Sequence, residues 1–235
     1  SEIRVSTDNL SKEKNGYGQG LDLDDQKRPL GAINFNDKYG KFNATAIADS
    51  SKEKTIYLTF DQGYENGYTT VILDVLKEKN VKAIFFVLQD YAEKNPELIE
   101  RMIDEGHVIG NHSKSHYSMP GLTGNECKDE IDSLHQYMID NYNYEMNMFR
   151  PPMGEYSEFS LAKTMECGYQ TVMWSYAYKD WEVDNQPLYE TAYEKLVNAA
   201  HPGAIYLLHS VSKTNAEVLP AVIDKLVSMG YTFKV

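Results

Sequence analysis

The feature that most constrains the fold is a regular alternation of short apolar runs with helical stretches, from residue 55 to the end of the chain. Thr123 and Glu126 open one of the helical stretches with the spacing of a capping box. Strands that alternate with helices are typical of a parallel sheet covered by helices, either an open doubly wound sheet or a closed barrel. The expected strands are 55–60 (TIYLTF), 83–88, 108–111, 148–150, 169–175, 204–209 and 231–235.

The first 50 residues differ from the rest, because Gly, Asn, Asp and Lys are frequent and periodic apolar positions are few. We expect 1–50 to be an extended arm that packs on the main domain and holds at most a short strand or hairpin. Residues 51–235 then form the main α/β domain.

The charge balance excludes some classes of partner. The chain has 35 Asp and Glu against 23 Lys and Arg, a formal net charge of −12. Nucleic acids and anionic membranes both attract basic patches on proteins, so we expect neither as a partner.

No apolar run has the length of a transmembrane helix, and we expect no membrane insertion. Cys127 and Cys167 lack metal-type spacing and are expected to be free thiols.

Polar side chains follow five of the expected strands, at the point where each strand ends. In a parallel barrel these strand ends meet on one face, where active sites are built. The predicted site therefore collects ionisable groups from segments far apart in the chain. They are Asp61 and Gln62, the stretch 111–116 with His112 and His116, Arg150, Asp180 beside Trp181, and His209.

Each of these residues also has an ordinary structural interpretation. His112 and His116, four residues apart, are suited to hold one metal ion, although such pairs also occur on plain surfaces. Asp61 is a candidate general base or a simple turn residue. Arg150 either holds that carboxylate ionised or forms a surface salt bridge. His209 is a candidate proton donor or a half-buried histidine. Their convergence at one strand edge favours the functional interpretation.

Five motifs carry a resemblance to a known family. TFDQG, HSKSH, RPPMG, DW and LLHS, in this order, resemble the motifs of the polysaccharide deacetylases (carbohydrate esterase family 4, the NodB-homology domain) over about residues 51–235. The longer stretches FDQGYENGY, SYAYKDW and HPGAIYLLHSVSKTNAEVL are similar to the branch of N-acetylmuramic acid deacetylases from spore-forming bacteria. The resemblance implies a distorted (β/α)7 barrel with an N-terminal extension and a metal-dependent N-deacetylase.

The resemblance also implies roles for single residues. Asp61 matches the catalytic base, Arg150 the residue that orients it, His209 the general acid and Asp180 the aspartate that tunes this acid. His112 and His116 match the metal ligands. Three positions match substrate-binding residues: the backbone N–H of Met153 at the oxyanion, and Trp181 and Leu207 at the acetyl pocket.

Gln62 departs from the family pattern, which has a third metal ligand, usually Asp, at this position. An amide oxygen can coordinate a divalent ion but brings no charge, so we expect the metal to be bound weakly. Zinc is the expected ion, with cobalt and manganese as alternatives.

The expected function is removal of N-acetyl groups from the glycan strand of peptidoglycan, at N-acetylmuramic acid on the way to muramic δ-lactam during sporulation. Two alternatives stay open at this point. One is deacetylation of N-acetylglucosamine or of an O-acetylated glycan, and the other is a metal-poor carbohydrate-binding protein with little activity. A wall substrate implies an exported protein that acts at the cell wall, although the sequence shows no leader, and we expect a monomer.

Overall fold

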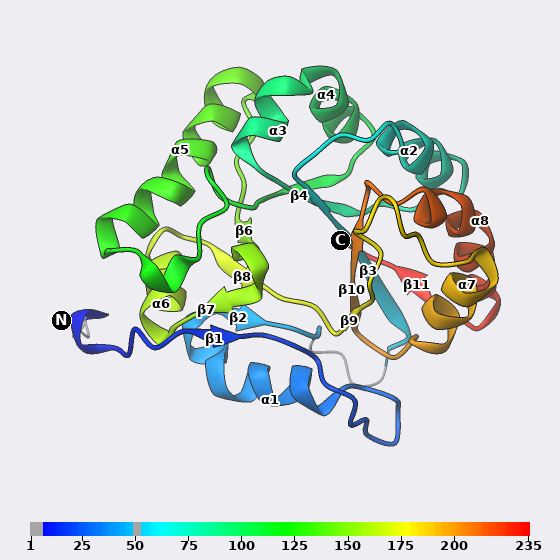
Figure 1. The fold of residues 1–235 in the computed structure, drawn as a ribbon, viewed down its shortest axis with the longest axis horizontal. Helices are drawn as coiled ribbons and strands as arrows, with labels where there is room; N and C mark the ends of the chain where they lie inside the picture. The colour runs from blue at the N-terminus through cyan, green and yellow to red at the C-terminus, as the bar shows by residue number, and fades with distance from the viewer. Residues whose placement is uncertain (1–6, 49–52) are drawn as a thin grey trace.

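The computed structural model describes residues 7–48 and 53–235. Its main sheet is parallel throughout and curls into a half-barrel with helices outside (Figure 1). The expectation of an α/β barrel is therefore confirmed. In sheet order the strands are β2 (Ala44–Thr45), β8 (Gln170–Val172), β6 (Met148–Phe149), β5 (Val108–Asn111), β4 (Ile84–Val87), β3 (Thr55–Gln62), β10 (Ala204–His209) and β9 (Tyr176–Ala177), and β11 (Thr232–Phe233) also pairs with β3.

Within residues 53–235, the outer layer consists of seven helices together with short 3-10 turns. The expected capping box opens α5, where the Thr123 hydroxyl accepts from the Glu126 N–H and the Glu126 carboxylate accepts from the Thr123 N–H. One core cluster joins the sheet to the helices, and Phe60 of β3 is part of it. The helices are α2 (Thr69–Glu78), α3 (Gln89–Lys94), α4 (Pro96–Asp104), α5 (Gly124–Tyr142), α6 (Glu158–Glu166), α7 (Tyr189–Asn198) and α8 (Lys213–Ser228).

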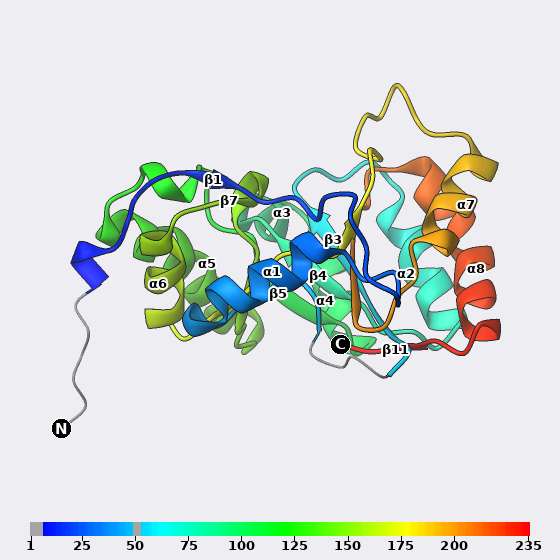
Figure 2. The same ribbon diagram turned by 90° about the horizontal axis from the view of Figure 1, so that it is seen from below.

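The N-terminal segment is not extended throughout, and this corrects the sequence expectation. It forms helix α1 (Leu30–Tyr39), whose buried Ala32, Phe35 and Tyr39 recur at helical spacing and pack in a second core cluster. Strand β2 then joins the main sheet by pairing with β8. Earlier, β1 (Asn15–Gly16) pairs antiparallel with β7 (Glu155–Tyr156). From residue 7 the segment runs from beside α6 along one side of the barrel (Figure 2). The expected boundary between residues 50 and 51 lies outside the described residues.

The expected strand 169–175 is too long: β8 covers only Gln170–Val172, and β9 begins after the expected range, at Tyr176, at a different place in the sheet. The Met173 N–H still donates to the Thr45 carbonyl, on the β2 side, whereas the Ser175 N–H donates to the Ile205 carbonyl, on the β10 side. The chain therefore changes hydrogen-bond partners within three residues, so that β8 lies near one end of the strand order and β9 at the other. This change of partners is tertiary, so the local apolar pattern does not reveal it.

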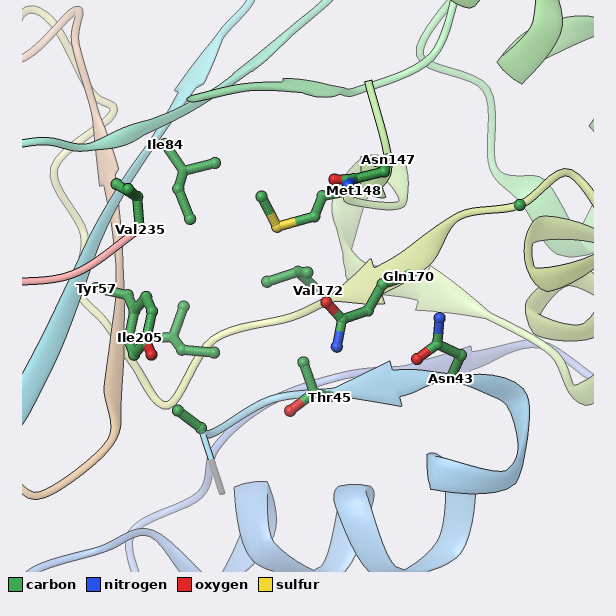
Figure 3. A pocket seen from close by; sticks show the side chains of 12 residues that line it. Asn43, Thr45, Tyr57, Ile84, Asn147, Met148, Gln170, Val172, Ile205 and Val235 are labelled. Atoms are coloured by element: carbon green, nitrogen blue, oxygen red, sulfur yellow. The ribbon is translucent and has the colours of Figure 1, made fainter. Parts of the chain in front are cut away.

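The two ends of the barrel differ in chemistry. A cavity of about 670 Å³ lies among the amino-terminal halves of the strands, and Figure 3 shows its amide and apolar side chains. Its described lining residues include Asn43, Asn147 and Gln170 but no His, Asp, Glu, Lys or Arg. The ionisable groups of the predicted site lie at the other end of the strands, as the parallel topology requires.

Candidate active site

A pocket of about 1030 Å³ opens at the carboxyl ends of the strands. Seven of the ten predicted site residues line it, and these are Asp61, His112, His116, Met153, Trp181, Leu207 and His209. The other three are buried, with at most 1% of the surface of each residue exposed, and they are Gln62, Arg150 and Asp180. The predicted residues therefore gather at the carboxyl ends of the strands, as expected. Seven of them face the pocket, and three lie buried beneath its lining.

Asp61, at the end of β3, is held by a fully buried arginine. Arg150 Nη1 donates to Asp61 Oδ1 at 2.9 Å and to the Thr59 hydroxyl at 2.7 Å. Its other nitrogens donate to the carbonyls of Val172 and Met173. Burial alone would raise the pKa of Asp61, but the charges of Arg150, His112 and His209 outweigh burial and hold that pKa below its ordinary value. The Asp61 carboxylate is therefore ionised and fixed in orientation.

His209, at the end of β10, is paired with Asp180. Asp180 Oδ1 lies 2.7 Å from His209 Nδ1, and Asp180 Oδ2 accepts from the His209 N–H at 2.8 Å. Burial lowers the pKa of His209, but the hydrogen bond and charge of Asp180 raise it to a net value above the ordinary one. Because Nδ1 is engaged by the carboxylate, Nε2 remains the ring nitrogen available to a substrate.

His112 and His116 follow β5 and lie edge to face, with ring centroids 5.1 Å apart. His112 Nδ1 donates a hydrogen bond to the Arg150 carbonyl at 2.7 Å. The other ring nitrogen of His112, Nε2, lies 3.7 Å from Asp61 Oδ2. Burial lowers the pKa of His112, so the ring is neutral. A neutral imidazole whose second nitrogen donates to a carbonyl is the usual state of a metal-binding histidine.

Gln62 is buried and does not line the pocket. Glu65 Oε1 accepts from the hydroxyls of Thr69 and Tyr91, so both hydroxyl protons are already used. Gln62 Nε2 must therefore be the donor in its contacts with Tyr91 Oη (3.0 Å) and Thr69 Oγ1 (3.3 Å). This fixes the orientation of the amide and leaves Gln62 Oε1 buried without a hydrogen-bond partner.

The donor set fits a divalent cation that is bound with little protein charge. Among residues 7–48 and 53–235, no three or more His, Cys, Asp and Glu side chains form a metal-binding group. The two imidazoles of His112 and His116 remain as neutral donors in the pocket lining, and the Gln62 oxygen, buried outside that lining, is left without a hydrogen-bond partner. Such donors suit a borderline ion such as zinc, but a site that lacks a carboxylate ligand holds the ion less tightly.

The remaining predicted residues form the pocket walls. Met153 has φ of 62°, an uncommon left-handed conformation for a non-glycine residue, in the turn after Pro151 and Pro152. Trp181 is half exposed, and its ring centroid lies 5.8 Å from that of His209, edge to face. Leu207 lies two residues before His209 on β10, and its side chain therefore faces the same side of the strand.

The comparison with protein families decides the identity. A model described as "Polysaccharide deacetylase" matches residues 48–172, more than half of the chain. The chain belongs to the polysaccharide deacetylase family. It is 48% identical over 201 residues, 85% of this chain and 76% of the other, to the peptidoglycan-N-acetylmuramic acid deacetylase PdaA of Bacillus subtilis. It is 34% identical to the peptidoglycan-N-acetylglucosamine deacetylase PgdA of Listeria monocytogenes, over 80% of this chain and 39% of that protein.

Solved structures of the family agree with the fold. The structure of Bacillus subtilis PdaA, a family 4 carbohydrate esterase, superposes with a TM-score of 0.90 at 43% identity and covers 96% of both chains. A family 4 carbohydrate esterase from Bacillus anthracis gives a TM-score of 0.79 at 39% identity, over 96% of this chain and 95% of that one. The expected family and (β/α)7 barrel class are therefore confirmed.

Sequence reasoning missed several residues that support the family motifs. Asn215 of α8 donates to Asp180 Oδ2 at 2.7 Å, and the Thr59 hydroxyl accepts from Arg150. Thr59 was within reach of sequence reasoning, because it lies two residues before Asp61 and so faces the same side of β3. Asn215 carries no such signal. Tyr17 and Gln19, in the N-terminal segment, also line the pocket, and they lie outside the residues that the family model matches.

None of the helices in the part of the chain that the structure describes combines the length and apolar character needed to cross a bilayer.

Proposed function

We propose that this chain hydrolyses the N-acetyl group of N-acetylmuramic acid in peptidoglycan, on the way to muramic δ-lactam. The observation that carries the proposal is the pairing of an ionised carboxylate, Asp61, with a histidine of raised pKa, His209, in one pocket. An acid and a base of opposite protonation state suit amide hydrolysis. The choice of muramic acid is supported by the likeness to PdaA.

The reaction uses these groups in sequence. Asp61 removes a proton from the attacking water, and the water oxygen adds to the acetyl carbonyl carbon. The Met153 N–H donates to the oxygen that becomes negative. His209 then transfers a proton from Nε2 to the departing sugar nitrogen, so that acetate and a free amine leave. Arg150 keeps Asp61 ionised, and Asp180 keeps His209 in the tautomer that presents Nε2.

A divalent cation, zinc or alternatively cobalt or manganese, would be held by His112 and His116, with Gln62 Oε1 as a neutral third donor. When bound, it supplies Lewis-acid chemistry that polarises the carbonyl and makes water more acidic. The identity of the ion and the participation of Gln62 belong to the proposal.

The substrate implies the remaining context. A peptidoglycan glycan strand lies outside the cytoplasmic membrane, so we propose that the protein is exported, acts at the cell wall during sporulation and works as a monomer. A binding-competent but nearly inactive protein is disfavoured because Asp61, Arg150, His209 and Asp180 are all present and paired.

The test is mass spectrometry of muropeptides after incubation of peptidoglycan with the purified protein and added Zn²⁺. We expect an acetyl group to be lost from muramic acid, and no loss with Asp61→Asn. Loss from glucosamine instead would overturn the choice of sugar and favour an activity like that named for PgdA. No loss from either sugar would favour the carbohydrate-binding alternative.

A further inference from the structure

Tyr64 is an exposed aromatic residue at the rim of the active-site pocket. Its side chain is 66% exposed and lines the pocket. Among the described residues, no hydrogen bond or ring contact to the Tyr64 side chain is formed. Neither the catalytic steps nor the proposed cation site uses it. Ligand pockets are lined largely by apolar and aromatic side chains, so the place of Tyr64 in the pocket lining makes it a candidate for ligand contact.

The loop that carries Tyr64 is tied down on both sides. Glu65 accepts from the hydroxyls of Thr69 and Tyr91 and from the Gly67 N–H. Asn66 Nδ2 donates to the Val211 carbonyl, in the segment after β10, at 3.0 Å. The backbone on the C-terminal side of Tyr64 is therefore anchored to α2, α3 and the β10–α8 connection. The exposure of the ring reflects the way this loop presents it.

The strand order places Tyr64 opposite a second exposed ring. β10, which ends at His209, lies between β3 and β9 in the sheet. Tyr64 follows the end of β3, and Trp181, 50% exposed, follows β9. Because the strands are parallel, the two aromatic residues flank the strand end that carries the proton donor. The pocket lining thus includes an exposed ring from the segment after each of the two strands that neighbour β10.

We propose that Tyr64 is a stacking platform for a pyranose ring of the glycan strand, at the sugar next to the one that is deacetylated. This inference rests on the proposed function, because it takes the substrate to be a glycan chain. Sugar rings present apolar C–H faces, and a tyrosine ring offers a large, rigid apolar surface with few rotatable bonds. The proposed proton transfers use Asp61 and His209 and do not involve Tyr64, so its contribution is to binding.

The first experiment measures acetate release from glycan strands by wild type, Tyr64→Ala and Tyr64→Phe. Loss of the ring should raise KM about tenfold and leave kcat within about twofold. Tyr64→Phe should keep the wild-type KM, because stacking uses the ring and not the hydroxyl. Tyr189→Ala is the matched control, since Tyr189 is an exposed tyrosine, 40%, at the start of α7 and does not line the pocket. It should behave as wild type.

Other outcomes overturn the inference. An unchanged KM in Tyr64→Ala, a loss of kcat alone, or an equal loss in Tyr64→Phe would each rule out stacking. A second measurement separates this inference from the proposed function. Calorimetry of strand binding to Asp61→Asn, with and without Tyr64→Ala, detects the platform without turnover. Weaker binding in the double variant supports stacking even if the wild type releases no acetate, and equal binding rejects it.

Discussion

The two halves of the active site are built in different ways. The acid–base half consists of Asp61 with Arg150 and His209 with Asp180, and each of these pairs has a direct contact of 2.9 Å or less. The cation half consists of His112, His116 and Gln62, and it leaves a buried amide oxygen without a partner. The first half is complete from protein groups alone, whereas under the proposed function a bound ion would complete the second.

The difference shows which catalytic side chains are held in place by hydrogen bonds to the protein itself. Arg150 is bound to the carbonyls of Val172 and Met173 as well as to Asp61, so the carboxylate is tied to the core of the barrel. The Gln62 amide is tied to Thr69 and Tyr91 through its nitrogen only. We therefore expect changes in the first half to act on catalysis and stability, and changes in the second to act on cation affinity.

The largest expected effect is loss of the base. Asp61→Asn should lower kcat/KM for glycan deacetylation by about 10³-fold, because removal of a general base costs on the order of 10²–10⁴. Acetate release measures it, and circular dichroism checks that the fold persists. Activity within tenfold of wild type would assign the base to another residue.

The next effect is on stability. Arg150→Met should lower the free energy of unfolding by about 3–5 kcal/mol, because Asp61 loses its charge partner and the Val172 and Met173 carbonyls lose a buried donor. Urea unfolding measures the change. Lys79→Met is the control, since Lys79 pairs with the exposed Asp224, and its loss should cost less than about 1 kcal/mol. Equal losses of unfolding free energy in the two variants would show that the Asp61–Arg150 pair stabilises the fold no more than a surface salt bridge does.

The pH dependence tests the His209–Asp180 pair. As the proton donor, His209 works in its charged form, so activity falls as pH rises through its pKa. Asp180 raises that pKa and extends activity toward higher pH. Asp180→Asn should therefore move the alkaline limb of the kcat/KM profile to lower pH and reduce the rate by about tenfold. A limb that does not move would show that His209 is not the group that titrates there.

The smallest expected effect sharpens the cation half. Gln62→Asp should bind Zn²⁺ about tenfold more tightly, because a carboxylate adds charge to the ligand set, and tenfold corresponds to about 1.4 kcal/mol. Isothermal titration calorimetry measures it. Tyr91→Phe should leave affinity within about twofold, since it removes an acceptor of the Gln62 amide and adds no charge. Unchanged affinity in Gln62→Asp would place residue 62 outside the ligand set.

The positions of the acid–base residues follow from the sequence more directly than the surroundings of Gln62 do, for a physical reason. Asp61 and His209 lie within the last two residues of β3 and β10, Arg150 directly follows β6, and parallel topology alone brings strand ends together. The partners of Gln62 come from α2 and α3, and side-chain hydrogen bonds of this kind leave no local pattern. The expected ligand role of Gln62 accordingly remains a proposal, while its contacts with Thr69 and Tyr91 are visible only in the folded chain.

The same distinction holds for the fold. The capping box of α5 was predictable because Thr123 and Glu126 act within one helical turn. Helix α1 was missed because its three buried positions lie within a short helix in a Gly- and Asn-rich segment. The end of β8 before Met173 and the start of β9 at Tyr176 depend on which strands accept the Met173 and Ser175 N–H groups. Local apolar periodicity cannot contain that information.

The most direct test of the two-half account is a Zn²⁺ titration of acetate release from peptidoglycan glycan strands, after treatment with a chelator. The account predicts that wild-type activity is low after chelation and rises to saturation as Zn²⁺ is added, whereas Asp61→Asn stays inactive at every concentration. Wild-type activity that is indifferent to chelation and Zn²⁺, or an Asp61→Asn variant that reaches the wild-type rate at saturating Zn²⁺, would contradict it.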